Sequence, residues 1–302
     1  MVRFIIAALA APLAVAVAGS AAVTATIPVG PQACGIAAVG SYLYADSYGK
    51  GTVAKIDPST NRVVRKALVA AGPCGMTGGA GSLWVEDYNG NAIVRVNPRT
   101  LKVIKRIHTG PLPWDVATGA GSIWATNSGN GTVSRIDPKQ NRVVKQIKVG
   151  GSPTCVRFGG GAIWVGNSAG GDIERVDPTT NKVQTVHVGN HASELCVDPR
   201  PDGVWVADNF DDSVTVLDPK TYAVRTTITV PSRPTDLWRG TDGDEWVASR
   251  VAGSVSRIDP STLAVVETVK TGGNPFVIRG AFGDIWTANY VGVSLWRLHV
   301  QP

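Results

Sequence analysis

Apolar and polar positions alternate in short runs along most of the chain, and glycine- or proline-rich turns separate the runs. This alternation predicts β-strands, and no helical periodicity competes with it. An aromatic residue recurs in these runs at intervals of 40 or 41 residues. The anchors are Tyr44, Trp84, Trp124, Trp164, Trp205, Trp246 and Trp286. A period of about 40 with strand-like alternation predicts a β-propeller in which each repeat forms one blade.

The repeat around Trp164 illustrates the four strands expected in every blade. Strands A to D are expected at Thr154–Phe158, Ala162–Gly166, Asp172–Val176 and Lys182–Val188. A glycine corner follows strand A, and an Asp/Asn-Pro turn joins strands C and D, where Pro fixes φ and the carboxylate accepts turn N–H groups. The expected fold class is therefore all-β: a seven-bladed β-propeller of four-stranded antiparallel blades.

The two ends of the chain are expected to complete one blade together. After Trp286 there is room for strand B and for a strand C at Ser294–Leu298, but not for strand D. The segment Val23–Gly30 matches the strand D and corner of an internal repeat, Val143–Gly150. We therefore expect the N-terminal strand to close the ring, which leaves no open edge between the first and last blades.

Residues 1–22 have a different character. Arg3 is followed by an apolar run to Ala18, and Ala16-Val17-Ala18 fits a small-x-small cleavage pattern. This predicts a signal peptide cut after about Ala18 to Ala22, with residues 23–302 as a single propeller domain. A permanent membrane anchor is the alternative, which the short apolar run disfavours. We expect a secreted or periplasmic protein with no membrane span after signal removal.

The charge and the cysteines refine this expectation. The formal net charge is +6, and the basic excess is scattered along the repeats, which predicts a solvated surface rather than nucleic-acid binding. Cys34 and Cys74 are 40 residues apart and Cys155 and Cys196 are 41 apart, so each pair occupies equivalent positions in neighbouring repeats. An exported protein with this spacing is expected to form the disulfides Cys34–Cys74 and Cys155–Cys196. Reduced core thiols are the alternative, and metal binding is less favoured because no CxxC or HxxxH spacing occurs.

The repeat resembles two known groups of propellers. GTVSRIDPKQNRVVKQIKVGGSP, from Gly131 to Pro153, is similar to the YVTN-type repeat of bacterial surface and periplasmic propellers. The G-x-(I/L)-W and R-I-D elements also resemble the streptogramin lyase (virginiamycin B lyase) family. The resemblance covers nearly the whole mature chain and implies the propeller fold. It says less about activity, because these elements recur in the blades and are mainly structural.

The residues that the lyase family uses for catalysis do not appear at the matching positions. The family places a Glu three residues after a blade Trp, where this chain has Ser47, Asp87, Asn127, Asn167, Asp208, Ser249 and Asn289. The family also places a His after the Pro that opens a strand A, where this chain has Cys74, Trp114, Thr154, Thr235 and Phe276. The resemblance therefore argues against streptogramin-type lyase activity in this chain.

The strand directions place the B–C and D–A loops on one face of the ring, the usual place for a propeller ligand. On this face the candidate ligand-binding residues, which break the repeat pattern, are Trp114, Asp115, His191, Glu194, Asp236, Arg250 and Phe276. The candidate metal-binding residues, at the ends of the B strands, are Asp87, Asn127, Asn167, Asp208 and Asn289. Their oxygens could hold a divalent cation such as Ca²⁺ or Mg²⁺. The structural alternative is a turn residue that bonds its own backbone.

Two functions are compatible with these features. The first is an exported binding or interaction propeller, whose partner is a small molecule, glycan or peptide at the channel mouth, or another exported protein. The second is a metal-assisted enzyme, either a streptogramin-lyase-like C–O lyase or a gluconolactonase-like lactonase with a diverged site. The first is favoured because no complete catalytic set is found. We expect a monomer.

Overall fold

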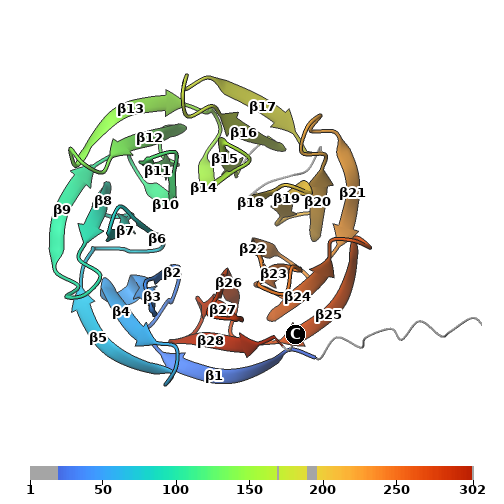
Figure 1. Cartoon of the computed structure of the whole chain (residues 1–302), viewed down its shortest axis with the longest axis horizontal. Helices are drawn as coiled ribbons and strands as arrows, with labels where there is room; N and C mark the ends of the chain where they lie inside the picture. The colour runs from blue at the N-terminus through green and yellow to red at the C-terminus, as the bar shows by residue number, and fades with distance from the viewer. Residues whose placement is uncertain (1–19, 169, 189–195, 301–302) are drawn as a thin grey trace, which may run out of the picture.

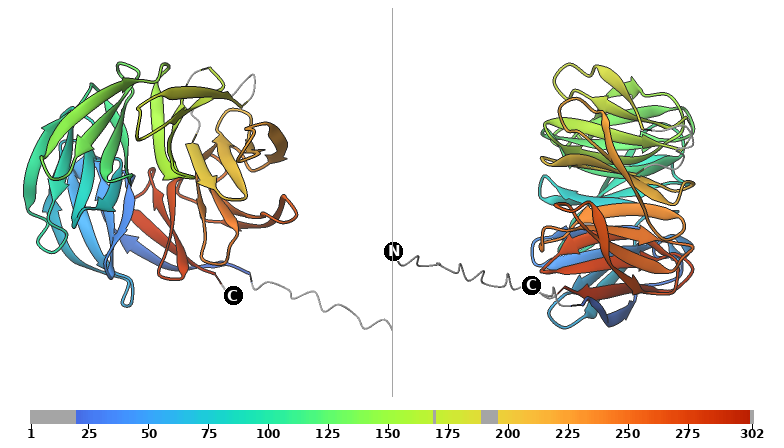
Figure 2. Two further views of the ribbon diagram at one scale, coloured as in Figure 1. Left: turned by 45° about the horizontal axis from the view of Figure 1, so that its top comes forward. Right: turned by 90° about the vertical axis from the view of Figure 1, so that its right-hand side faces the viewer.

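The computed structural model describes residues 20–168, 170–188 and 196–300, which form seven four-stranded antiparallel sheets arranged as the blades of a ring (Figure 1). The strands of each blade run from the channel outward in the order A, B, C, D. Seen from the side, the ring is a thick disc (Figure 2). The predicted all-β, seven-bladed propeller is confirmed.

The blades follow one another in chain order. Blade 1 contains β2 (Ile36–Val39), β3 (Tyr42–Ser47), β4 (Thr52–Asp57) and β5 (Arg62–Leu68), with the short 3-10 helix η1 (Tyr48–Lys50). Blade 2 contains β6 (Met76–Gly79), β7 (Ser82–Asp87), β8 (Ala92–Val96) and β9 (Val103–His108). Blade 3 contains β10 (Pro113–Gly119), β11 (Ser122–Asn127), β12 (Thr132–Asp137) and β13 (Arg142–Lys148). Blade 4 contains β14 (Pro153–Gly159), β15 (Ala162–Asn167), β16 (Asp172–Val176) and β17 (Val183–His187).

The remaining three blades complete the ring. Blade 5 contains β18 (Cys196–Arg200), β19 (Gly203–Asp208), β20 (Ser213–Leu217) and β21 (Val224–Thr229). Blade 6 contains β22 (Pro234–Arg239), β23 (Glu245–Ser249), β24 (Ser254–Asp259) and β25 (Ala264–Lys270). Blade 7 contains β26 (Pro275–Ala281), β27 (Asp284–Asn289), β28 (Ser294–His299) and β1 (Ala22–Pro28).

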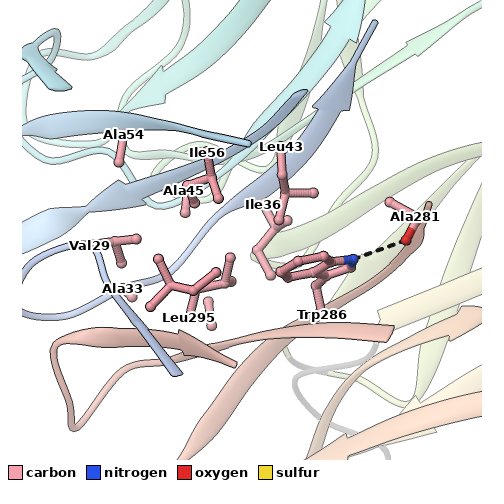
Figure 3. Packing of buried hydrophobic residues seen from close by; sticks show 12 residues of the cluster. Val29, Ala33, Ile36, Leu43, Ala45, Ala54, Ile56, Ala281, Trp286 and Leu295 are labelled. Carbon is pink, nitrogen blue, oxygen red and sulfur yellow. Dashed lines mark hydrogen bonds between the residues drawn. The ribbon is translucent and has the colours of Figure 1, made fainter. Parts of the chain in front are cut away.

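Blade 7 is completed by the N-terminal strand, as predicted. β1 pairs antiparallel with β28, with Ile27 opposite Leu295 and Ala22 opposite His299. Side chains from both ends of the chain then pack into one cluster at the seam between blades 7 and 1 (Figure 3). In that cluster the Trp286 indole donates a hydrogen bond of 3.0 Å to the Ala281 carbonyl. The ring is therefore closed by pairing and packing between residues at opposite ends of the chain.

The aromatic anchors are buried, and several of them are linked to an arginine. In blade 3, Arg135 lies opposite Trp124 across strands B and C, with its guanidinium carbon 5.0 Å from the indole centroid. The same guanidinium donates to Pro178 O at 2.6 Å, in the Asp-Pro turn of blade 4. Arg95 reaches the blade 3 turn and Arg297 the blade 1 turn in the same way. The repeated Trp, Arg and Asp-Pro elements therefore join adjacent blades.

Both predicted disulfides are present and both join A-strand segments of neighbouring blades. Cys34 and Cys74 link blades 1 and 2 with a Cα–Cα distance of 4.7 Å, and Cys155 and Cys196 link blades 4 and 5 with a Cα–Cα distance of 5.1 Å.

The predicted signal peptide falls largely outside the described residues, which exclude residues 1–19, and its cleavage stays a prediction. Within the described ranges, no helix has the length and apolar character needed to cross a membrane.

We expect Ile27→Ala to lower the free energy of unfolding by about 2–4 kcal/mol, because Ile27 is 2% exposed and packs in the closing cluster. Urea denaturation followed by tryptophan fluorescence measures this change. Thr26→Ala, at an exposed position on the same strand, is the control and should change stability by less than about 0.5 kcal/mol. Equal losses in the two variants would contradict the role of β1 as a packed closing strand.

Candidate functional site

A cavity of about 660 Å³ lies at the channel mouth on the B–C and D–A face, and residues of all seven blades line it. One position of the repeat contributes from every blade: the residue four places after the anchor aromatic. These seven residues are Tyr48, Tyr88, Ser128, Ser168, Asn209, Arg250 and Tyr290. The repeat therefore places one variable side chain from each blade at the wall of a common cavity.

The aromatic residues of the cavity wall are concentrated on one side. Five of them, which we call the aromatic arc, come from the consecutive blades 7, 1, 2 and 3: Phe276, Tyr290, Tyr48, Tyr88 and Trp114. The Tyr88 and Trp114 rings meet edge to face with centroids 5.5 Å apart, and the Phe276 and Tyr290 rings are equally close. These contacts hold the rings in place, which lowers the entropy lost when a ligand orders them.

The opposite wall is polar. The residues of this polar arc come from blades 4, 5 and 6: Thr154, Ser168, Asn209, Thr235 and Arg250. Several are oriented by the fold. Thr235 donates to Phe276 O at 2.8 Å, and Asn209 donates to Pro234 O at 3.0 Å. The cavity therefore has apolar rings on one side and hydroxyl and guanidinium groups on the other.

Four charged residues of the A strands form an ionic floor: Asp115, Arg157, Asp236 and Arg279. Arg157 donates to Asp115 Oδ2 at 2.5 Å and, across blade 5, to Asp236 Oδ1 at 2.9 Å. Arg279 also pairs with Asp236. Arg157 and Arg279 are three residues beyond Thr154 and Phe276 on their strands, so the two guanidinium groups start deeper in the channel than the arcs do. The network ties blades 3, 4, 6 and 7 together around the channel.

The ionic floor is balanced in charge and its pKa shifts follow from its geometry. Burial opposes the charge on Arg157, but the Asp115 and Asp236 carboxylates outweigh burial, so the pKa of this guanidinium is raised. Burial and the nearby Arg157 charge lower the pKa of Arg279. Two cations face two anions, so the floor has no net charge with which to attract an ionic ligand. Removing one member would leave a buried partner unpaired, which costs about 3–5 kcal/mol.

Two further acidic side chains are buried behind the wall of blades 1 and 2. Asp46 accepts hydrogen bonds from the backbone N–H groups of Cys34 and Gly35, and Glu86 accepts one of 2.8 Å from Cys74 N. Burial raises the pKa of each carboxyl well above its ordinary value. Both side chains therefore hold the backbone at the Cys34–Cys74 disulfide, and they keep their protons to a higher pH than exposed carboxyl groups do.

The structure brings together five of the seven predicted ligand-binding residues. Trp114, Asp115, Asp236, Arg250 and Phe276 all line the cavity. Trp114 and Phe276 belong to the aromatic arc, Arg250 to the polar arc, and the two aspartates to the ionic floor. The other two predicted residues, His191 and Glu194, lie outside the described residues.

The predicted metal-binding residues have a different position. Asp87, Asn127, Asn167, Asp208 and Asn289 are buried at the ends of the B strands and are not part of the cavity wall. Asp87 accepts from the N–H groups of Ala71 and Gly72, and Asn127 from Gly110 N, so these two hold the D–A corner that leads into their own blade. In the described parts of the chain, no group of three or more His, Cys, Asp or Glu residues is placed to hold a metal ion.

Sequence reasoning missed the tyrosines of the arc and the two arginines of the floor. The sequence signal for the tyrosines lies four residues after each anchor aromatic, one residue beyond the predicted metal-binding position. Three places after the anchor, every blade has Ser, Asp or Asn, which is typical of a structural cap. Four places after it, the blades differ, and three tyrosines fall on the adjacent blades 7, 1 and 2. Variation at one register among near-identical repeats therefore marked the ligand-facing position.

Solved structures with a similar fold are known. A streptogramin B lyase superposes with a TM-score of 0.79 at 14% identity, covering 92% of this chain and 97% of that one. A catalytically inactive histidine-to-alanine variant of virginiamycin B lyase from Staphylococcus aureus, solved with quinupristin, gives 0.80 at 15%, covering 93% and 100%. Hydrazine synthase of Kuenenia stuttgartiensis gives 0.75 at 15%, covering 90% and 97%. No family model and no curated protein matches the sequence. At these identities the likeness establishes the fold alone.

We expect Glu86→Gln to stabilise the protein at neutral pH. Because the folded pKa of Glu86 is raised, the unfolded state loses its proton first as pH rises above about 4.5, and the stability of the parent protein falls. Gln keeps an acceptor for Cys74 N and cannot ionise. Its advantage should grow from zero near pH 4 by up to about 1.4 kcal/mol per pH unit.

Urea denaturation between pH 4 and pH 8 measures this difference. Asp211→Asn, at an exposed position, is the control and should follow the parent protein at every pH. A Glu86→Gln variant whose stability runs parallel to that of the parent would show that the pKa of Glu86 is not raised by folding.

Proposed function

We propose that the chain is an exported ligand-binding propeller whose cavity takes a small, ring-bearing amphipathic molecule. The observation that carries this proposal is the division of the cavity wall into the aromatic arc and the polar arc. A cavity of about 660 Å³ is within the usual range for small-molecule sites. A flat apolar ring of the ligand would stack on Tyr88 and Trp114, while its polar edge would face Thr154 and Thr235.

The charge of the site supports a ligand that binds through hydrogen bonds rather than through a net charge. Asp115 and Asp236 are already paired with arginines, so neither is available to a cationic group without breaking a buried pair. The hydroxyls of Thr154, Ser168 and Thr235 in the polar arc remain as orienting groups. Such sites are selective for ligands that satisfy their polar groups, because a buried group left unpaired costs about 1–3 kcal/mol.

The geometry favours binding over catalysis. Of the histidines in the described ranges, His108 and His187 lie on outer D strands, and His299 bonds Asp284 at 2.7 Å on strand C of blade 7. None of these three lines the cavity. Among the described residues, the carboxyl groups whose pKa is raised do not line the cavity: Asp46, Glu86, Glu174, Asp244 and Glu245. A lyase or lactonase activity would therefore depend on groups other than these.

A peptide or protein partner is the second candidate, favoured by one observation. Three apolar side chains project from the B–C loops of the consecutive blades 5, 6 and 7: Phe210, Val251 and Val291 are 50%, 64% and 74% exposed. They lie five places after the anchors, next to the cavity-lining position. A partner that covers them would be anchored by a side chain inserted into the cavity, a common arrangement at interfaces.

Quinupristin, which is named with one of the similar structures, is the first probe. We expect it to bind, and we expect Trp114→Ala to weaken its affinity about tenfold, equivalent to about 1.4 kcal/mol. Isothermal titration calorimetry measures the affinity. The control is Phe282→Ala, since Phe282 is 41% exposed at an A–B corner on the opposite face, where blades 2 and 3 already have Ala80 and Ala120.

The same titration distinguishes the alternatives. Equal weakening by both variants would contradict a site at the aromatic arc. Release of a ring-opened product, detected by mass spectrometry, would show the lyase alternative instead. If quinupristin does not bind, a thermal-shift panel of aryl glycosides and aromatic dipeptides tests the ligand class, and no shift with any of them would overturn the proposal.

A further inference from the structure

The basic excess that is scattered in the sequence is gathered in space. The outer strands of blades 1, 2 and 3 follow one another along one arc of the rim (Figure 1). β5, β9 and β13 carry eight basic residues and no acidic one. These residues, which we call the basic belt, are Arg62, Arg65, Lys66, Lys105, Arg106, Arg142, Lys145 and Lys148. All eight are exposed.

The other four blades provide an internal comparison. Their outer strands β17, β21, β25 and β1 contain only two basic residues, Arg225 and Lys270, and one acidic residue, Glu267. The pairing register identifies equivalent positions. Arg65, Lys105 and Lys145 correspond to Gln184, Thr226, Glu267 and Ala25 in blades 4 to 7. The blade therefore folds without a cation at this position.

In blades 1 to 3 the cation at this position opposes another cation. Arg65 lies opposite Lys55, Lys105 opposite Arg95, and Lys145 opposite Arg135. Like charges directly opposite each other across two strands are unfavourable. Burial, followed by the charges of Arg65 and Arg99, accordingly lowers the pKa of Lys55. In blade 6 the equivalent pair has opposite charges, which is favourable: Glu267 lies opposite Arg257, with 3.8 Å between Arg257 Nη1 and Glu267 Oε2.

Few belt cations are neutralised locally. Arg106 pairs with Asp87 at 2.7 Å. Among the described residues, Arg62, Arg65, Lys66, Lys105, Arg142 and Lys145 form no ion pair within 4.0 Å. The nearby turn aspartates Asp57 and Asp137 accept hydrogen bonds from their own turns. The belt therefore keeps a positive potential at a cost to the fold, which points to a partner.

We propose that the basic belt binds a flexible linear polyanion that runs across the outer strands of blades 1 to 3. Charge complementarity supports this occupant, because equivalent cations on three adjacent blades form rows along the rim. The rim is convex in this direction (Figure 1), so a flexible chain can follow it more closely than a flat bilayer can. The three strands carry no Phe, Tyr or Trp, and therefore no surface on which nucleic-acid bases would stack.

Heparin oligosaccharide and inorganic polyphosphate are the probes, because they present sulfate and phosphate respectively on a flexible chain. The belt variant combines Arg65→Thr, Lys105→Thr and Lys145→Thr, because blade 5 has Thr226 at the equivalent position. The control combines Lys50→Thr, Lys220→Thr and Lys270→Thr, which removes the same charge from exposed positions outside the belt. Both variants lower the net charge from +6 to +3.

We expect the full-length protein to bind at least one polymer, and the slope of log affinity against log salt concentration to fall by about three in the belt variant. The control should retain the parent slope. The melting temperature of the belt variant should equal or exceed that of the parent, so weaker binding cannot be ascribed to misfolding. Binding of only one polymer would support the proposal and identify its anionic group.

Three outcomes would overturn the proposal. The first is that the protein binds neither polymer at low salt. The second is that the belt and control variants lose affinity equally, which would show a dependence on net charge alone. The third is belt-dependent binding to phosphatidylglycerol vesicles without binding to either soluble polymer, which would assign the belt to a bilayer surface. Trp114→Ala should bind the polymer normally, so this test is independent of the cavity.

Discussion

The ring depends on a link that recurs at several seams between blades. An arginine on strand C stacks on the anchor tryptophan of its own blade and donates to the Asp-Pro turn of the next. The link fixes the relative position of two blades with a planar guanidinium, which donates in a defined geometry. Blade 1 lacks both residues, and there the Tyr44 hydroxyl donates to Pro98 O at 2.7 Å. A different side chain thus reaches the equivalent carbonyl, which shows that the constraint is the contact and not the residue type.

This link also explains why the cavity is assembled from one register. Once each anchor is fixed against the next blade, the end of every strand B has the same position relative to the channel. The residue three places after the anchor then accepts hydrogen bonds from the backbone of the D–A corner, as Asp87 and Asn127 do. The next residue is free to vary and projects into the cavity. Specificity can change at this position without changing the seam, which separates stability from function within each repeat.

The fold was predictable from the sequence because its determinants repeat. Spacing identified the blades, the closing strand and both disulfides, since each depends on equivalence between repeats. The site was less predictable, because it depends on contacts between blades that are not equivalent. Nothing in the sequence indicates that Arg157 crosses blade 5 to reach Asp236, 79 residues away. The cap position was interpreted as a candidate metal-binding set because it places oxygens from several blades on one face, whereas its recurrence favours the structural alternative of a turn residue.

Around the channel, the seams are held by links that differ from one another. Disulfides join blades 1 to 2 and 4 to 5. Carboxylates accept from the next blade's backbone at three others: Asp115 from Val156 N, Asp198 from Arg239 N, and Asp236 from Ile278 N. The A strands are short and face the cavity, so they cannot be joined by large buried apolar side chains without filling it. Compact covalent and charged links hold the inner wall and leave space for a ligand, while the tryptophan–arginine link joins the outer parts of blades 2 and 3, 3 and 4, and 7 and 1. The closed ring therefore accounts for the repeated contacts in the outer part of the blades, and the cavity at its centre accounts for the varied links between the A strands.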